Sequence, residues 1–309
     1  MEYTEAENSA CYAILNERIS LIQRTMEDEG IENFMFSWSG GKDSCVLSKL
    51  LDLAIPDNKI PRVWADTGLE YNLMRKFIFE QMKKDKRIIR LNPTVNIKQM
   101  LEKEGYPFNS KAHSALVDRY NNTGLESISV RKYLNKLQEG DGEPWTTSFR
   151  CPKRLLHQFT PEYKNRLKIS DKCCKKLKED PINKYMKEHK FKYHIIGIRA
   201  DEGGRRKNAK CFSYHNKKLY SFQPLATITS EWEDWFIQTY NVELCDIYKP
   251  PYNFERTGCK GCPFAKHLRK ELETLQEFFP EEHKQCYDIW RPVYDEYWLL
   301  RYRLLVEIK

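Results

Sequence analysis

The order of hydrophobic and polar positions alternates between two periods along the first third of the chain. Three short segments have the length of strands, an apolar run at residues 34–38 and two further candidates at 61–65 and 87–91. A stretch in which apolar residues recur every three or four positions follows each segment, at residues 44–53, 70–83 and 97–104. Strands that alternate with helices in this way predict a parallel sheet covered on both faces. We therefore expect a doubly wound α/β fold with a mostly parallel sheet.

The rest of the pattern adds helices on both sides of this region. Helical periodicity extends over residues 5–29 and 228–239, a further strand is expected at 193–198, and a short helix at 152–159. Beyond Cys262 the chain is helical and rich in aromatic residues. Aromatic residues at helical spacing usually form a packed core, with a partner-docking face as the alternative. We predict an N-terminal helix (1–30), a central α/β domain (31–264) and a helical C-terminal extension (265–309).

The composition limits where the protein works. Mean hydropathy is −0.73, and 31% of the 309 residues are charged. No stretch approaches the roughly 18 consecutive apolar residues of a transmembrane helix, and the acidic start does not resemble a signal peptide. We expect a cytoplasmic protein without membrane contact. The net charge of +8 suits nucleotide or nucleic-acid partners, and a solvated basic surface is the alternative.

A glycine-rich segment separates the first predicted strand from its helix. It reads Ser-Gly-Gly-Lys-Asp-Ser at residues 39–44. Gly40 and Gly41 let the backbone approach an anion, and the N–H groups and dipole of the following helix attract negative charge. The two serines add hydroxyl donors, and Lys42 adds a positive charge. The spacing is not that of the Walker motif. The segment predicts a phosphate-binding loop of another kind, with a tight turn and a capping serine as the alternative.

Ten cysteines in a reducing compartment need an explanation other than disulfides. Cys173 and Cys174 are adjacent, while Cys259 and Cys262 form a Cys-x-x-Cys pair. Such clusters indicate metal binding or redox chemistry. Four thiolates suit an iron–sulfur cluster or a tetrahedral zinc ion, although adjacent cysteines are less usual for zinc. Buried thiols without a ligand are the third interpretation, and Cys211 is a candidate to replace one of the four.

These motifs together resemble a known family. The segment 39–44 is similar to the pyrophosphate loop of the ATP pyrophosphatases and of the phosphoadenosine phosphosulfate reductases. Asp66-Thr67-Gly68 resembles the Asp-Thr-Gly segment of the reductases, and the two cysteine pairs resemble those that hold a [4Fe-4S] cluster in assimilatory adenylyl-sulfate reductases. Residues 197–202 with Arg205-Arg206 are similar to a strand end that contacts the nucleotide. The resemblance covers residues 34–264.

The resemblance implies an adenine nucleotide α-hydrolase-like fold, with the nucleotide at the carboxyl ends of the strands. The residues expected to bind it are Ser39, Gly40, Gly41, Lys42, Asp43, Ser44, Gly68, Arg199 and Arg205. Lys42, Asp43 and Asp66 are the expected catalytic residues, with a helix cap as the alternative role of Asp66. The expected cluster ligands are Cys173, Cys174, Cys259 and Cys262. The implied cofactors are ATP or a sulfonucleotide, Mg²⁺ and a [4Fe-4S] cluster.

Three functions are consistent with these features. Reductases of the family carry a nucleophilic cysteine in a Glu-Cys-Gly-Leu-His-like tail, which we do not find, and we interpret Cys286 as a buried structural thiol. Our first hypothesis is cleavage of ATP to AMP and pyrophosphate, which activates an acceptor such as nucleic acid for sulfur from a donor protein such as a cysteine desulfurase. The second is reduction of adenylyl sulfate or its 3′-phosphate by a partner thiol such as thioredoxin. The third is a nucleotide-binding or defence-related scaffold without turnover.

Overall fold

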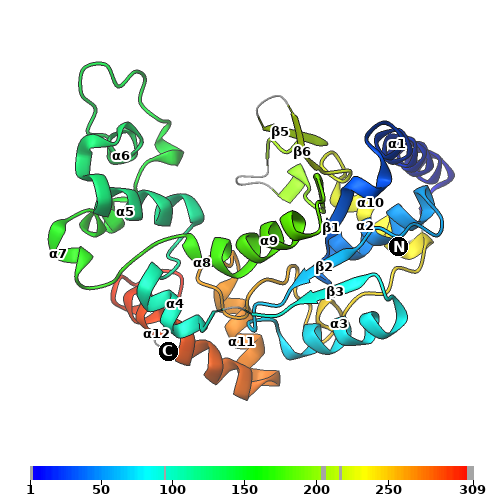
Figure 1. Cartoon of the computed structure of the whole chain (residues 1–309). Coiled ribbons are helices and arrows are strands. Elements are labelled where there is room, and N and C mark those ends of the chain that lie inside the picture. Colours follow the sequence, from blue (N-terminus) through cyan, green and yellow to red (C-terminus); the bar gives the residue numbers. More distant parts are fainter. Residues whose placement is uncertain (1–2, 94, 203–206, 216–217, 305–309) are drawn as a thin grey trace. The chain divides into compact units, whose positions relative to one another are not determined.

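The chain folds into two compact units, each assembled from segments that are distant in the sequence (Figure 1). The computed structural model describes residues 3–93, 95–202, 207–215 and 218–304. Unit 1 consists of Met1–Asn92 and Asp180–Thr257, and unit 2 consists of Pro93–Glu179 and Gly258–Lys309. The predicted division at residues 30 and 264 follows the order of the chain rather than its contacts, and it remains a prediction.

Unit 1 contains the sheet. Its strands are β1 (Phe34–Ser37), β2 (Arg62–Ala65), β3 (Ile88–Leu91), β4 (Tyr193–Ile196), β5 (Phe212–His215) and β6 (Lys218–Phe222). Its helices are α1 (Glu5–Glu29), α2 (Lys42–Ala54), α3 (Asn72–Lys84), α9 (Asp180–Glu188) and α10 (Ser230–Thr239). The strand order is β3-β2-β1-β4-β6-β5. All neighbouring pairs are parallel except β5 with β6, which confirms the expected doubly wound, mostly parallel sheet.

Helices cover both faces of this sheet. Successive strand residues point to opposite sides, so each strand can contribute apolar side chains to both faces. On one face Met35 and Val63 pack against Met186 of α9. On the other face Trp64 of β2 meets Phe79 of α3 edge to face, with ring centroids 5.8 Å apart. Helices α1 and α10 pack on α2. Both faces are therefore apolar, as the runs of apolar strand residues require.

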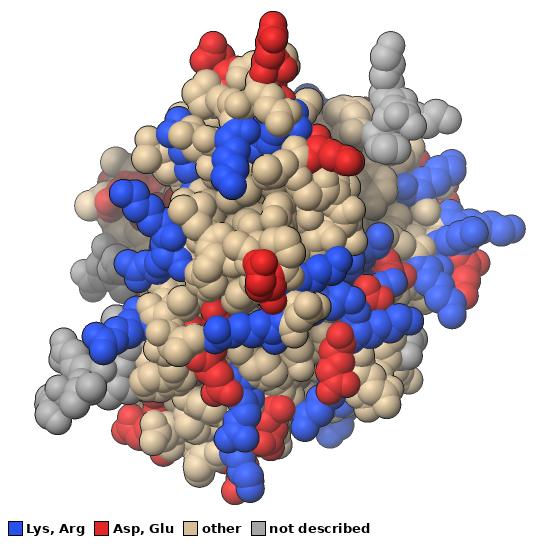
Figure 2. All heavy atoms as spheres, turned by 90° about the vertical axis from the view of Figure 1, so that its left-hand side faces the viewer, with Lys and Arg blue, Asp and Glu red and all other residues tan. Residues whose placement is uncertain are grey.

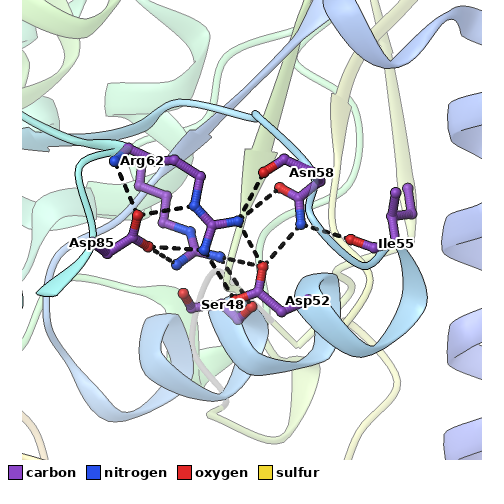
Figure 3. A network of polar contacts seen from close by, with 7 residues as sticks. Ser48, Asp52, Ile55, Asn58, Arg62 and Asp85 are labelled. Carbon is purple, nitrogen blue, oxygen red and sulfur yellow. Dashed lines mark hydrogen bonds and ion pairs between the residues drawn. The ribbon is translucent and has the colours of Figure 1, made fainter.

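A network of charged side chains closes the amino-terminal edge of the sheet (Figure 3). Arg62, the first residue of β2, donates to Asp52 at 2.7 Å and also bonds Asp85. Arg87 reaches the same two carboxylates, at 2.8 Å to Asp52 and 2.9 Å to Asp85. Asn58 donates to Asp52 at 2.9 Å. Two guanidinium groups and two carboxylates balance one another, so the network joins α2, β2 and the start of β3 without net charge.

Unit 2 is helical. Its helices are α4 (Ile97–Glu104), α5 (Lys111–Thr123), α6 (Ile128–Leu134), α7 (Pro161–Lys164), α8 (Lys172–Cys174), α11 (Leu268–Phe278) and α12 (Pro280–Leu299). A π-helical turn, Lys175–Glu179, follows α8 directly. The Tyr106 N–H donates to the carbonyl of Lys168 at 2.8 Å, and the Ser170 N–H donates back to the carbonyl of Tyr106 at 3.0 Å. This short parallel bridge fixes the chain just before Cys173.

The predicted elements and the observed ones differ mainly in the last third of the sheet. The antiparallel pair β5–β6 was not expected, because β5 and β6 carry polar and charged residues among their aromatic ones and so lack an uninterrupted apolar run. The short helix expected at 152–159 is a 3-10 helix, Lys153–Gln158. Among the described residues no helix combines the length and the apolar character needed to cross a membrane. On the face shown in Figure 2, basic and acidic side chains are interspersed.

Candidate functional site

The predicted phosphate loop connects the carboxyl end of β1 to the first turn of α2. Gly40 has a φ of +73°, and a Cβ atom there would lie 2.7 Å from Cγ1 of Ile78 on α3. Both the backbone conformation and the close approach therefore require glycine at this position. The Ser44 hydroxyl donates to the carbonyl of Gly41 at 2.8 Å, and the Gly41 N–H donates to the Ser39 hydroxyl at 3.3 Å. These hydrogen bonds within residues 39–44 fix the conformation of the loop.

Helix α2 begins without a side-chain cap. Its N-cap residue is Gly41, which makes no capping hydrogen bond. Side chains cap α1, α4, α5, α7 and α10, whereas α3, α6, α8, α11 and α12 also begin without a side-chain cap. The serine-capped turn that we weighed as the alternative is therefore not what the loop forms. The Lys42 N–H donates to the Tyr248 hydroxyl at 3.2 Å. An uncapped helix start beside a lysine is suited to an anion, because the dipole and the N–H groups both favour negative charge.

The Lys42 side chain is paired with acidic groups of helix α10. Its Nζ atom lies 2.9 Å from Oε2 of Glu233 and 3.4 Å from Oδ1 of Asp234. Burial alone would lower the pKa of Lys42, but the two carboxylates outweigh that effect and raise it. The lysine is therefore charged at neutral pH.

Asp43 and Arg199 form the second charged pair of the loop. Nε of Arg199 lies 2.7 Å from Oδ1 of Asp43, and its Nη2 lies 3.2 Å from Oε2 of Glu233. Nη1 of Arg199 also donates to the Ser230 hydroxyl at 3.1 Å. Residues predicted from two distant segments, 39–44 and 197–202, thus lie together with α10 at the carboxyl ends of β1 and β4.

Glu233 is a member of this site that the sequence analysis missed. Its side chain has no exposed surface, and burial, followed by the neighbouring Asp43 carboxylate, raises the pKa of Glu233 to about 7. Sequence offers little signal, because Glu233 lies between Trp232 and Asp234 on an amphipathic helix that also carries the exposed Glu231. Only the packing of α10 on α2 distinguishes the buried acid from the exposed one.

Asp66 lies at the end of β2 and is fully engaged. Its buried carboxylate accepts from Nη1 of Arg75 at 2.8 Å, from Nε of Arg90 at 2.7 Å and from the Gly68 N–H at 2.9 Å. Burial would raise the pKa of Asp66, but Arg75, Gly68 and Arg90 together lower it. Helix α3 is preceded by Tyr71 as its N-cap residue, so Asp66 does not cap it. Its proposed catalytic role remains a prediction.

Arg205 and Cys211 are the two remaining candidate residues of the sequence analysis. Arg205 lies outside the described residues. Cys211, the candidate substitute ligand, belongs to unit 1 and accepts a hydrogen bond from Nη1 of Arg18 at 3.3 Å. The other four candidate ligands all belong to unit 2, whereas Cys211 belongs to the unit that contains the sheet.

The four paired cysteines interact within unit 2. A hydrogen bond with the Cys173 thiol lowers the pKa of Cys174 to about 6, with Lys111 and Lys178 adding to the effect. The pKa of Cys173 is raised by Cys174 and by burial, and further by Cys262 and Cys259. The Cys262 N–H donates to the carbonyl of Cys259 at 3.1 Å, so that pair lies on one tight turn. The fold thus brings both predicted pairs within electrostatic reach of one another.

The donor chemistry of this cysteine group fits a thiolate-ligated metal or cluster. Thiolates are the ligands of iron–sulfur clusters and of structural zinc, and the lysines beside Cys174 favour its charged form. Across residues 3–93, 95–202, 207–215 and 218–304, no three His, Cys, Asp or Glu side chains are set at the spacing of a metal site. Ligation by the four cysteines therefore stays a prediction.

Comparison with known proteins identifies the family. The model of the phosphoadenosine phosphosulfate reductase domain matches residues 33–151 and 120–265, more than half of the chain. The chain belongs to this family. The uncharacterized protein MJ0973 of Methanocaldococcus jannaschii is 25% identical over 291 residues, which cover 92% of this chain and 54% of the relative. The chain thus spans about half the length of the curated relative that it matches.

Two solved structures are similar at a low level. Phosphoadenylyl-sulfate reductase from Candida auris, in a phosphate complex, has 9% identity and a TM-score of 0.41, covering 80% of this chain and 92% of that one. The U34-tRNA thiolase NcsA from Methanococcus maripaludis, with its [4Fe-4S] cluster, has 15% identity and a TM-score of 0.38, covering 94% of this chain and 80% of that one. At these TM-scores neither structure indicates a shared activity.

Proposed function

We propose that the protein cleaves ATP to AMP and pyrophosphate in order to activate an acceptor for sulfur transfer, with nucleic acid as the candidate acceptor class. The uncapped start of α2, with Lys42 beside it, is the observation that carries the proposal. Membership of the phosphoadenosine phosphosulfate reductase family supports an adenine nucleotide and sulfur chemistry.

The residues of the loop have distinct roles in this proposal. Lys42 and the backbone N–H groups at the start of α2 stabilise the charge that develops on the departing pyrophosphate. Gly40 keeps the backbone close enough for those contacts. Arg199 holds Asp43 and Glu233 and so fixes the acidic side of the site. Mg²⁺ bound to the phosphates would neutralise part of their charge, and Asp43, whose side chain is partly exposed, is the carboxylate suited to it.

The cysteine group has a separate role in the same proposal. Cys173, Cys174, Cys259 and Cys262 would hold a [4Fe-4S] cluster, which supplies electrons or a binding position for sulfur when it is present. Lys111 and Lys178 beside Cys174 offset the negative charge of the thiolates.

A second candidate is reduction of a sulfonucleotide by a partner thiol, which the family description favours. The same loop would then bind the phosphates of adenylyl sulfate or of its 3′-phosphate, and a protein such as thioredoxin would supply the thiol. The third candidate, a scaffold that binds nucleotide without turnover, uses the loop alone.

One set of assays separates the three candidates. Anaerobically purified protein is given ATP and Mg²⁺ with total tRNA or duplex DNA, and pyrophosphate release is measured. Parallel reactions contain adenylyl sulfate or its 3′-phosphate with thioredoxin, and sulfite is measured. Pyrophosphate release supports the first function, and its absence with every acceptor contradicts it. Sulfite release establishes the second function, and tight nucleotide binding without either product favours the third.

A further inference from the structure

Helix α12 presents a row of hydrogen-bond donors to the Cys259–Cys262 turn. Nε1 of Trp290 donates to the carbonyl of Lys260 at 3.0 Å. The Tyr294 hydroxyl donates to the carbonyl of Gly261, and the Tyr297 hydroxyl donates to the carbonyl of Pro263 at 3.0 Å. The three donors are four and three residues apart, so they share one face of the helix. All three side chains are buried.

The backbone of the turn packs closely against α12 at Gly261. Gly261 has a φ of +61°, and a Cβ atom there would lie 2.6 Å from the Tyr294 hydroxyl and 2.7 Å from Sγ of Cys286. The backbone between the two cysteines therefore packs directly on α12. Buried Lys260 adds a side-chain tie, since its Nζ lies 2.8 Å from Oε1 of Gln285.

Tyr297 connects this turn to the segment that faces the other cysteine pair. Its hydroxyl accepts from the Asn109 N–H at 2.8 Å while it donates to the carbonyl of Pro263. Its ring also packs on Phe108, with centroids 4.6 Å apart. Two residues after Asn109, the Lys111 side chain interacts with Cys174. One buried hydroxyl thus bridges the chain beside Cys262 and the segment 108–111, which carries the lysine that interacts with Cys174.

We infer that Tyr297 is a positioning residue that holds the two cysteine pairs at a fixed separation, with Trp290 and Tyr294 fixing the Cys-x-x-Cys turn beneath it. The inference rests on the proposed function insofar as the cysteines hold a cluster. Partners that orient metal ligands from outside the ligand set commonly change metal affinity when they are removed. Trp290, Tyr294 and Tyr297 therefore do more than fill a core, because their polar atoms bond to the carbonyls of residues 260, 261 and 263.

The test removes the bridge and keeps the ring. Tyr297→Phe is compared with Tyr133→Phe, which loses a buried hydroxyl bonded to Nδ1 of His113 at 2.9 Å elsewhere in unit 2. In protein loaded with iron and sulfide, we expect Tyr297→Phe to release iron to a chelator about tenfold faster than wild type. We also expect its visible and electron paramagnetic resonance spectra to shift, while Tyr133→Phe keeps the wild-type rate and spectra.

A second measurement needs no metal. In reduced, metal-free protein, alkylation of Cys259 and Cys262 is followed by peptide mass spectrometry, and Tyr297→Phe should accelerate it about tenfold over both wild type and Tyr133→Phe. Unchanged alkylation and unchanged iron release overturn the inference. If wild-type protein takes up no iron, the proposed cluster fails, yet the alkylation rates still decide whether Tyr297 positions the turn.

Discussion

The sheet of unit 1 carries a group of charged side chains at each edge, and the two groups differ in how well they stabilise their carboxylates. At the amino-terminal edge, Arg62 and Arg87 hold Asp52 and Asp85. Burial would raise the pKa of each carboxyl, but hydrogen bonds and charges of the arginines outweigh it and lower both. Every charge in this group is matched, so the group serves the fold.

At the carboxyl-terminal edge, the same residue types leave one acid poorly stabilised. Lys42 and Arg199 face Asp43 and Glu233, yet the pKa of Glu233 is raised to about 7 by burial and by Asp43. The side chain of Glu233 is 0% exposed, whereas that of Asp52 is 36% exposed. Complete burial destabilises the charged form of Glu233 more than the shared cations Lys42 and Arg199 stabilise it. Strained electrostatics of this kind gather at functional sites, and the uncapped first turn of α2 lies at this edge.

The largest expected effect comes from removing the cation of the carboxyl-terminal edge. Lys42→Met should lower pyrophosphate release by at least about 100-fold, because it removes a charge that stabilises the departing group. The matched control is Lys49→Met, which changes an exposed lysine on the same helix. Circular dichroism should show both variants folded. Equal activity of the two variants would remove the loop from the mechanism.

Breaking the amino-terminal edge should affect stability and spare nucleotide binding. Asp85→Asn leaves the buried Arg62 with one carboxylate fewer and should cost about 3 kcal/mol in urea unfolding at pH 7. The lowered pKa of Asp85 means that this stabilisation is present above its unfolded pKa near 3.8 and is lost as the pH falls through the folded value. The difference should therefore shrink at pH 3. Asp57→Asn, at an exposed position, serves as the control, and an equal loss in both variants would contradict the network's role.

Substitution of Gly40 separates the cost of the left-handed backbone conformation from the cost of a steric clash. Gly40→Ala should cost about 2 kcal/mol and weaken nucleotide binding, since it combines a left-handed backbone with a clash against Ile78. Gly140→Ala has a similar φ of +85° but no neighbouring atom within 4 Å. The control should lose only the conformational part in a denaturant titration. An equal cost at both positions would mean that Ile78 moves aside.

The effect expected from the buried acid is a change in the pH dependence of stability. Because the folded pKa of Glu233, about 7, lies above its ordinary 4.5, its contribution to stability is complete below pH 4.5 and is lost as the pH rises through 7. Glu233→Gln should therefore lose less thermal stability than wild type between pH 5 and pH 8. Glu231→Gln, at an exposed position of the same helix, should follow wild type. A Glu233→Gln profile parallel to wild type would show that the carboxylate is well stabilised after all.

The sequence by itself was sufficient for the parts of the protein that depend on local patterns. Segments of five or six residues that alternate with helical stretches predicted β1 to β4, because strands and helices that alternate form a parallel sheet. The string at residues 39–44 predicted the loop, since its glycines and the following helix are consecutive in the chain. The pattern did not reveal β5 and β6, which pair directly with each other and have no helical stretch between them.

The tertiary structure decided the features that depend on packing between distant segments. Burial separates Glu233 from the exposed Glu231, and the sequence carries no sign of which acid the core encloses. The arrangement of α12 over the Cys259–Cys262 turn likewise joins residues about 30 positions apart through backbone carbonyls, which every residue type possesses. The packing of distant segments decides which carbonyl accepts a hydrogen bond and which charge is buried. A local sequence pattern therefore cannot predict them.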